Sequence, residues 1–212
     1  MLTFTNVQKY YGGFLAIDIP TLSLEEGLWW VRGANGTGKT TFLKMIGGLL
    51  PFTGSIILNN DCDIRRQRQQ FVKLVNYAEA EPLFPPFLTA ADLVELYCET
   101  KKGDIQYARE LLKQLQVYDA YKKQIGTYSS GMVKKVSLVL AFIGEPKLIL
   151  LDEPLITLDF QAVNTVCSII NDCYQNGVSF IISSHQTLHD NQLFFTGDLL
   201  AEKRTVSKVT NV

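Results

Sequence analysis

The sequence predicts an α/β fold, with a mainly parallel sheet flanked by helices, an N-terminal antiparallel β subdomain and a helical insertion. Two late segments, residues 148–151 and 178–183, are continuously apolar strands separated by an expected helix over 164–174. This order of strand, helix and strand is typical of a parallel sheet covered on both faces. A glycine-rich segment, residues 33–40, joins an early strand to a helix, and this arrangement supports the same fold class.

Residues 33–40, Gly-Ala-Asn-Gly-Thr-Gly-Lys-Thr, match the phosphate-binding loop pattern G-x-x-x-x-G-K-[ST] at every fixed position. Its glycines allow successive backbone N–H groups to form an anion-binding nest, and the next helix directs its positive end to the same place. Lys39 supplies a charge for the β- and γ-phosphates, and the Thr40 hydroxyl can bind Mg²⁺. We expect a nucleoside triphosphate to contact the whole loop and the next residue: Gly33, Ala34, Asn35, Gly36, Thr37, Gly38, Lys39, Thr40 and Thr41.

The first part of the chain is rich in expected strands, and the part after Pro82 is rich in expected helices. The expected early strands cover residues 1–11, 17–24, 28–32, 54–58 and 72–77. After Pro82, possible helix caps recur at Thr89, Asp104 and Ser129. We therefore predict one domain, in which residues 1–82 and 146–212 form the nucleotide-binding core and residues 83–145 form a helical subdomain.

Two carboxylates, Asp152 and Glu153, directly follow the apolar strand 148–151. Ligands bind at the carboxyl ends of strands in parallel sheets, so both side chains are expected to face the phosphates. Asp152 can hold Mg²⁺, and Glu153 can orient or deprotonate an attacking water. The pair predicts hydrolysis of the bound nucleotide.

Composition excludes several classes of protein. The 212 residues are 47% hydrophobic and 19% charged, with a net charge of −1, so no nucleic-acid partner is expected. The sequence contains neither an apolar run of membrane-spanning length nor a signal peptide, so we expect a cytoplasmic protein. The four cysteines lack C-x-x-C spacing and fit reduced, buried side chains. Four basic pairs are expected to be solvated: Arg65-Arg66, Lys101-Lys102, Lys122-Lys123 and Lys134-Lys135.

Over nearly its full length the chain resembles the ATP-binding cassette family, the motor subunits of ABC transporters. The resemblance implies that Tyr11 stacks on adenine, and that Ser129 and Gly131, in the signature segment (residues 128–132), bind the γ-phosphate of ATP on a second cassette. It further implies that Asp159 is the D-loop aspartate and that His185 is the switch histidine, which contacts the γ-phosphate and acts in hydrolysis with Glu153.

One position departs from the family pattern. The family has a glutamine that touches Mg²⁺ at the entrance of the helical subdomain, and this chain has Ala80 there. Either Glu79 or Glu81 replaces the glutamine, or the contact is lost. Residues 83–88 lie where relatives form a groove for a transmembrane partner; the alternative for these apolar side chains is core packing.

The resemblance implies an ATP-hydrolysing subunit that binds ATP and Mg²⁺ and dimerises around ATP with an identical or different second cassette. It would lie at the cytoplasmic face of a membrane, bound to a separate transmembrane permease. Three alternatives remain: a soluble cassette with a ribosomal or DNA partner, another phosphate-loop enzyme such as a kinase or GTPase, and a weakly hydrolysing subunit paired with a stronger one.

Overall fold

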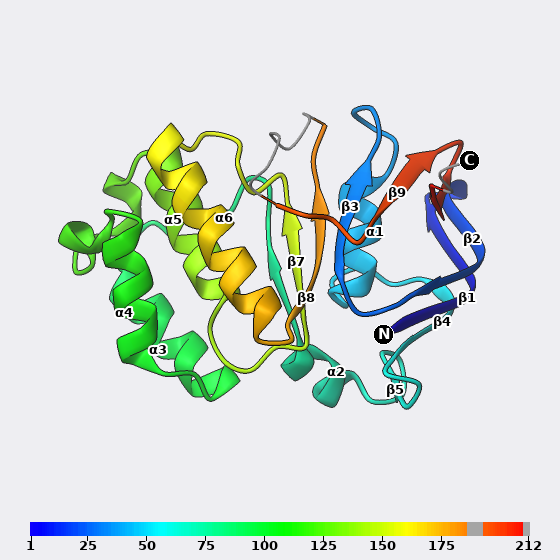
Figure 1. Cartoon of the computed structure of the whole chain (residues 1–212), viewed down its shortest axis with the longest axis horizontal. Helices are drawn as coiled ribbons and strands as arrows, with labels where there is room; N and C mark the ends of the chain where they lie inside the picture. The colour runs from blue at the N-terminus through cyan, green and yellow to red at the C-terminus, as the bar shows by residue number, and fades with distance from the viewer. Residues whose placement is uncertain (186–192, 210–212) are drawn as a thin grey trace.

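The computed structural model describes residues 1–185 and 193–209, which form two β-sheets with helices packed against them (Figure 1). The strands are β1 (Leu2–Tyr11), β2 (Phe14–Leu24), β3 (Leu28–Arg32), β4 (Thr53–Leu58), β5 (Cys62–Asp63), β6 (Val75–Ala78), β7 (Leu148–Asp152), β8 (Ser179–Ser183), β9 (Gly197–Glu202) and β10 (Thr205–Lys208). The helices are α1 (Lys39–Ile46), α2 (Arg68–Leu74), α3 (Ala90–Lys101), α4 (Ile105–Gln114), α5 (Ser130–Ala141) and α6 (Phe160–Gln175), with 3₁₀ turns at Tyr118–Ala120 and Ile125–Thr127.

The two sheets have different hydrogen-bond patterns. The smaller one has the order β2-β1-β4-β5 and is antiparallel throughout. The larger one has the order β10-β9-β3-β8-β7-β6; its neighbouring strands are parallel except for the antiparallel hairpin β9–β10. The expected mixed architecture, with an antiparallel N-terminal sheet and a mainly parallel second sheet, is confirmed.

Both faces of the parallel sheet are covered, because successive side chains of a strand point to opposite faces. On β7, Leu148 and Leu150 pack into one core with α1 and the antiparallel sheet. Ile149 and Leu151 pack into the other core, with α5 and α6. The continuously apolar sequence of β7 therefore fills two cores, with α1 between the two sheets.

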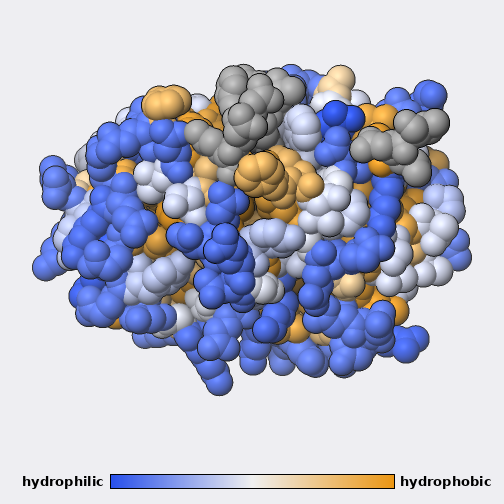
Figure 2. Space-filling view, viewed as in Figure 1, coloured by the Kyte–Doolittle hydropathy of each residue, from blue (hydrophilic) through white to orange (hydrophobic). Residues whose placement is uncertain are grey.

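The helices α3, α4, α5 and α6 gather at the end of the molecule opposite the antiparallel sheet (Figure 1). The expected caps form: Thr89, Asp104 and Ser129 precede α3, α4 and α5 and accept backbone hydrogen bonds from their first turns. In the view of Figure 2, hydrophilic residues dominate the surface over this helical end. The division into core and helical subdomain stays a prediction.

Two expected elements need correction. The strand predicted at residues 72–77 is wrong in its first half, because α2 continues to Leu74 and β6 begins only at Val75. Such a short apolar run fits either a helix or a strand, and packing of the buried Phe71 against the core beside α1 favours the helix here. The helix expected at 164–174 is longer and begins at Phe160, because Asp159 caps it.

Among the described residues, no helix has the length and apolar character needed to span a membrane. Cys62, Cys98 and Cys167 are buried free thiols and Cys173 is half-buried, as expected for reduced small side chains.

Candidate functional site

The phosphate-binding loop connects the end of β3 to the start of α1. Gly33 has a φ of 156°, and a Cβ on it would lie 2.5 Å from the carbonyl oxygen of Ala201 on β9. Gly38 is the N-cap of α1 with a φ of 102°, a left-handed conformation that favours glycine. Because Gly38 has no side chain to cap the helix, the first-turn N–H groups of α1 are available to an anion.

Lys39 is 7% exposed and folds back over this loop. Its Nζ donates to the carbonyl oxygens of Gly33, at 2.7 Å, and Ala34, at 3.2 Å. The same nitrogen lies 4.0 Å from Oε1 of Glu153 at the end of β7. Thr37 closes the loop by donating from Oγ1 to the Ala34 carbonyl at 2.9 Å. The charge of Lys39 is thus held between the loop and the predicted base.

A cavity of about 450 Å³ opens beside this lysine. Four segments distant in sequence line it: the phosphate-binding loop, the chain after β6, the chain after β7 and the chain after β8. The lining residues are Asn35, Gly36, Gly38, Lys39, Thr40, Thr41, Ala80, Glu81, Glu153, Ile156 and His185. Tertiary structure therefore brings the predicted phosphate-binding residues together with both predicted catalytic residues.

Asp152 is 1% exposed, and both of its carboxylate oxygens accept hydrogen bonds. Ser183 Oγ donates to Oδ1 at 2.5 Å, and the Tyr77 hydroxyl donates to Oδ2 at 3.3 Å. Burial, reinforced by the Asp152 charge, raises the pKa of Tyr77 well above its usual range, so its hydroxyl stays a donor. Sequence reasoning missed Tyr77 and Ser183, which hold the predicted metal ligand in one orientation.

The oxygen atoms of the side chains at this site are ligands of the kind that Mg²⁺ prefers. That ion takes one or two protein side chains together with substrate phosphates and water. Thr40 lines the cavity, and Asp152, buried next to the cavity residue Glu153 and oriented by Ser183, would be the second oxygen ligand. The described part of the chain contains no cluster of three His, Cys, Asp or Glu residues that could hold a metal alone.

Glu153 and His185 form a direct pair. Oε1 of Glu153 lies 3.0 Å from Nδ1 of His185, and Oε2 accepts from the His185 backbone N–H at 3.4 Å. Glu153 has a φ of 45°, which is uncommon for a residue with a side chain, and Ser183 holds this conformation by accepting from its backbone N–H at 3.1 Å. The conformation directs a carboxylate at the strand end into the cavity.

Three residues named from the family resemblance, in the signature segment and the D-loop, do not line this cavity. Ser129 caps α5, where its Oγ accepts from the Met132 N–H at 3.2 Å. Asp159 caps α6 and accepts from Nζ of Lys135, on α5, at 3.0 Å. A Cβ on Gly131 would lie 3.1 Å from the Thr157 carbonyl oxygen. The signature segment and the chain at residues 157–159 therefore contact each other, and Ser129, Gly131 and Asp159 do not line the cavity at the phosphate-binding loop.

Tyr11, the predicted adenine contact, is about half exposed at the end of β1. Its hydroxyl lies 3.4 Å from Oγ1 of Thr41 on α1, and Nζ of Lys9 lies 4.7 Å from its ring centroid. One face of an aromatic ring is thus placed beside the helix that begins at the phosphate-binding loop.

Glu79 and Glu81, the two candidates for the missing glutamine contact, lie in different places. The Glu79 carboxylate lies 3.4 Å from Nζ of Lys44 on α1, whereas Glu81 lines the cavity beside Ala80. Glu81 is therefore the better placed of the two carboxylates to replace the missing glutamine contact.

Lys134 contradicts the expectation that the basic pairs are solvated. It is 2% exposed, and its Nζ donates to the carbonyl oxygens of Glu79, Ala80 and Asp152. Burial lowers the pKa of Lys134 to about 8, against the raising effect of nearby carboxylates. Leu138 and Ala141 follow at helical spacing and are buried, and this pattern was the available signal.

The comparisons agree with this geometry. The family model described as "ABC transporter" matches residues 18–156. A cytochrome c biogenesis ATP-binding export protein, CcmA of Reclinomonas americana, is 31% identical over 195 residues, covering 89% of this chain and 86% of that protein. Rat ATP-binding cassette sub-family A member 2 is 31% identical over 196 residues, which cover 87% of this chain but 8% of that protein.

Among solved structures, a dimeric ATP-binding cassette in a post-hydrolysis state with ADP and Pi matches over 100% of both chains. Its TM-score is 0.84 at 21% identity, a likeness that concerns the fold. The family match covers more than half of the chain, and the fold agrees with it. The chain therefore belongs to the ABC transporter family, as an ATP-binding cassette.

Proposed function

We propose that the chain binds ATP with Mg²⁺ and hydrolyses it as the ATP-binding subunit of an ABC transporter. The observation that carries the proposal is the cavity in which Lys39, Thr40, Glu153 and His185 meet beside the phosphate-binding loop. A loop of backbone donors, a lysine charge and a carboxylate at a strand end are the groups that phosphoryl transfer to water requires.

In the proposed site, the loop N–H groups and Lys39 hold the β- and γ-phosphates. Thr40 and Asp152 would hold Mg²⁺, which supplies positive charge to the phosphate oxygens. Glu153 accepts the proton of a water that attacks the γ-phosphorus, while the bond from phosphorus to the ADP oxygen breaks. The 3.0 Å contact from Glu153 Oε1 to Nδ1 of His185 supports a role for His185 in orienting this base.

The signature residues support dimerisation around ATP. Ser129 caps α5 and Gly131 lies in its first turn, and neither lines the cavity that contains Lys39, so both are available to a nucleotide held by another cassette. A dimer has been seen for the similar cassette bound to ADP and Pi. We propose a dimer for this chain too, in which each ATP lies between one phosphate-binding loop and the signature segment of the other subunit.

A surface groove supports the proposal of a membrane partner. It has a volume of about 270 Å³ and is lined by Leu49, Tyr77, Glu79, Pro82, Leu83, Phe84, Tyr97 and Ser137. Leu83 at its edge is 91% exposed, whereas Phe84 packs against the core of the helical end. We propose that a separate transmembrane subunit covers the exposed part and holds the chain at the cytoplasmic face of the membrane.

Two measurements test these proposals. Purified chain with Mg²⁺ and ATP is expected to release phosphate, and binding of ATP without turnover would favour the weakly hydrolysing alternative. An affinity-tagged chain from detergent-solubilised cells of its source is expected to co-purify with a polytopic membrane protein. Recovery of a ribosome or a DNA-bound complex instead would contradict the transporter role and leave the ATPase assignment standing.

A further inference from the structure

The ammonium group of Lys134 links three parts of the candidate site. Its Nζ lies 2.7 Å from the carbonyl oxygen of Glu79, 3.0 Å from that of Ala80 and 3.1 Å from that of Asp152. A lysine ammonium has three N–H donors, and here each has one acceptor. The acceptors come from two segments, while the lysine itself belongs to α5, which follows the signature segment.

The position of this contact within the sheet matters. β6 is an edge strand whose pairing with β7 ends at Ala78 and Leu151. Beyond these residues the two chains separate, and Lys134 connects them at the first positions past the ladder. A buried charge is costly unless it is fully hydrogen-bonded, and the three carbonyl oxygens meet this need of the ammonium. Removing the ammonium would in turn leave these three oxygens without their donor.

Both segments joined in this way form walls of the nucleotide cavity. Ala80 and Glu81 line one side, and Glu153, the neighbour of Asp152, lines the other. Ala80 has no polar side chain with which to fix its own position. The Glu79 carboxylate pairs with Lys44 on α1, whereas the Lys134 ammonium contacts the backbone of both walls.

We propose that Lys134 is a positioning residue that fixes the 79–81 segment against the strand end at Asp152 and Glu153, and ties both to the signature helix α5. The proposal rests on the proposed ATPase function and deepens it. A movement of α5 would be transmitted by this ammonium to both walls of the cavity. Lys134 touches only backbone atoms of the site, so it acts on the geometry of the reaction and not on the reacting atoms.

The test compares wild type with Lys134→Met, which keeps the length of the side chain and removes the three donors. We expect the ATP Kd to stay within about twofold, because the phosphate-binding loop is untouched, while kcat falls by about 10- to 100-fold as the walls lose their alignment. Amide hydrogen exchange at residues 79–81 should become faster, with the phosphate-binding loop and α1 unchanged. Lys134→Arg retains the charge and donors and is expected to recover most of kcat.

The matched control is Lys123→Met, which removes an exposed ammonium from the helical end. It should leave kcat, Kd and hydrogen exchange at wild-type values. If Lys134→Met does not fold, Lys134→Gln, which keeps one amide donor group, should give an intermediate loss of kcat with the same local increase in exchange.

Unchanged kcat and unchanged exchange at 79–81 in Lys134→Met would overturn the proposal. Uniformly faster exchange over the whole chain, with kcat and Kd impaired together, would also overturn it, because that pattern marks a general structural role. Failure of the wild-type chain to release phosphate would instead count against the proposed function. Exchange measured with ATP bound would still decide whether Lys134 holds the 79–81 segment.

Discussion

Oε1 of Glu153 lies 3.0 Å from Nδ1 of His185, so a carboxylate from the end of β7 and an imidazole from the end of β8 meet at one point of the nucleotide cavity. The two strands are parallel neighbours, and residues at their carboxyl ends are brought to the same edge. Glu153 is thereby in hydrogen-bond reach of a partner that can orient it.

We expect Glu153→Gln to retain ATP binding and ATP-dependent dimers but to lose turnover by about a hundredfold or more, because the amide cannot accept the proton of water. Phosphate release and size-exclusion chromatography with and without ATP measure the two effects. Turnover near the wild-type rate would show that Glu153 is not the base.

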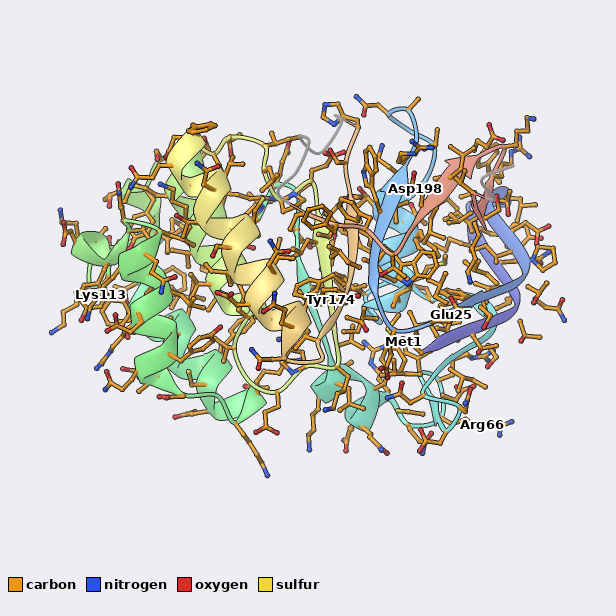
Figure 3. The ribbon with its side chains drawn as sticks, in the orientation of Figure 1. Met1, Glu25, Arg66, Lys113, Tyr174 and Asp198 are labelled. Atoms are coloured by element: carbon orange, nitrogen blue, oxygen red, sulfur yellow. The ribbon has the colours of Figure 1, made fainter. Side chains whose placement is uncertain are left out.

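Replacement of Lys39 by Ala should abolish measurable binding of ATP. The loop would lose the charge that its own carbonyl oxygens hold over the phosphate site. The matched control is Lys113→Ala, since Lys113 lies on α4 at the far helical end (Figure 3), where its ammonium contacts Glu110 and the Tyr118 ring. Binding can be followed with a fluorescent ATP analogue, and equal affinity for both variants would contradict the role of Lys39.

Thr89→Ala should destabilise the fold without affecting nucleotide binding. Thr89 accepts from the Asp92 N–H at 3.1 Å and Asp92 accepts from the Thr89 N–H at 2.8 Å, which is a complete capping box for α3. Loss of such a cap costs about 1 kcal/mol of unfolding free energy. Urea unfolding measures this loss, and a midpoint identical to that of wild type would count against the cap.

The pH dependence of the unfolding free energy should reveal the titration of Lys101. Its ammonium donates to the carbonyl oxygens of Val72 and Val75 near the end of α2. Burial lowers its pKa from 10.5 to about 8 in the folded chain. Between these two values the unfolded chain binds more protons than the folded one, so this group makes the free energy of unfolding rise with pH. Below pH 8 both states are protonated and the contribution is constant.

The buried thiols act in the opposite direction, since burial raises the pKa of Cys167 to about 11. We therefore compare wild type with Lys101→Met, in which the thiol effects cancel. The difference in unfolding free energy, wild type minus variant, should increase between about pH 8 and 10. A difference that stays constant over that range would show that Lys101 titrates alike in both states.

The local signals of the sequence were sufficient for much of the site. The pattern of residues 33–40 depends on backbone conformations that only glycine adopts easily, and it can be recognised without any tertiary contact. Asp152 and Glu153 were identified from their place after an apolar strand, and the caps at Thr89, Asp104 and Ser129 are set by hydrogen bonds within one turn.

Contacts between distant segments could not be predicted in the same way. Tyr77 and Ser183 became part of the site because β6 and β8 flank β7 in the sheet, and a sequence does not state the order of its strands. The end of α2 at residues 72–74 resembles a strand in composition, and packing chose the helix.

The sequence by itself determined which residues carry phosphate chemistry, since their spacing follows from local backbone geometry. Only the tertiary structure decided how they are held. Lys134 is one of a lysine pair, and a lysine side chain is normally solvated. Here α5 packs against β6 and β7 and encloses the ammonium among three carbonyl oxygens. Burial depends on how the helices and the sheet pack together. Because this packing buries Lys134, a residue type that is usually found on the surface connects the two walls of the site.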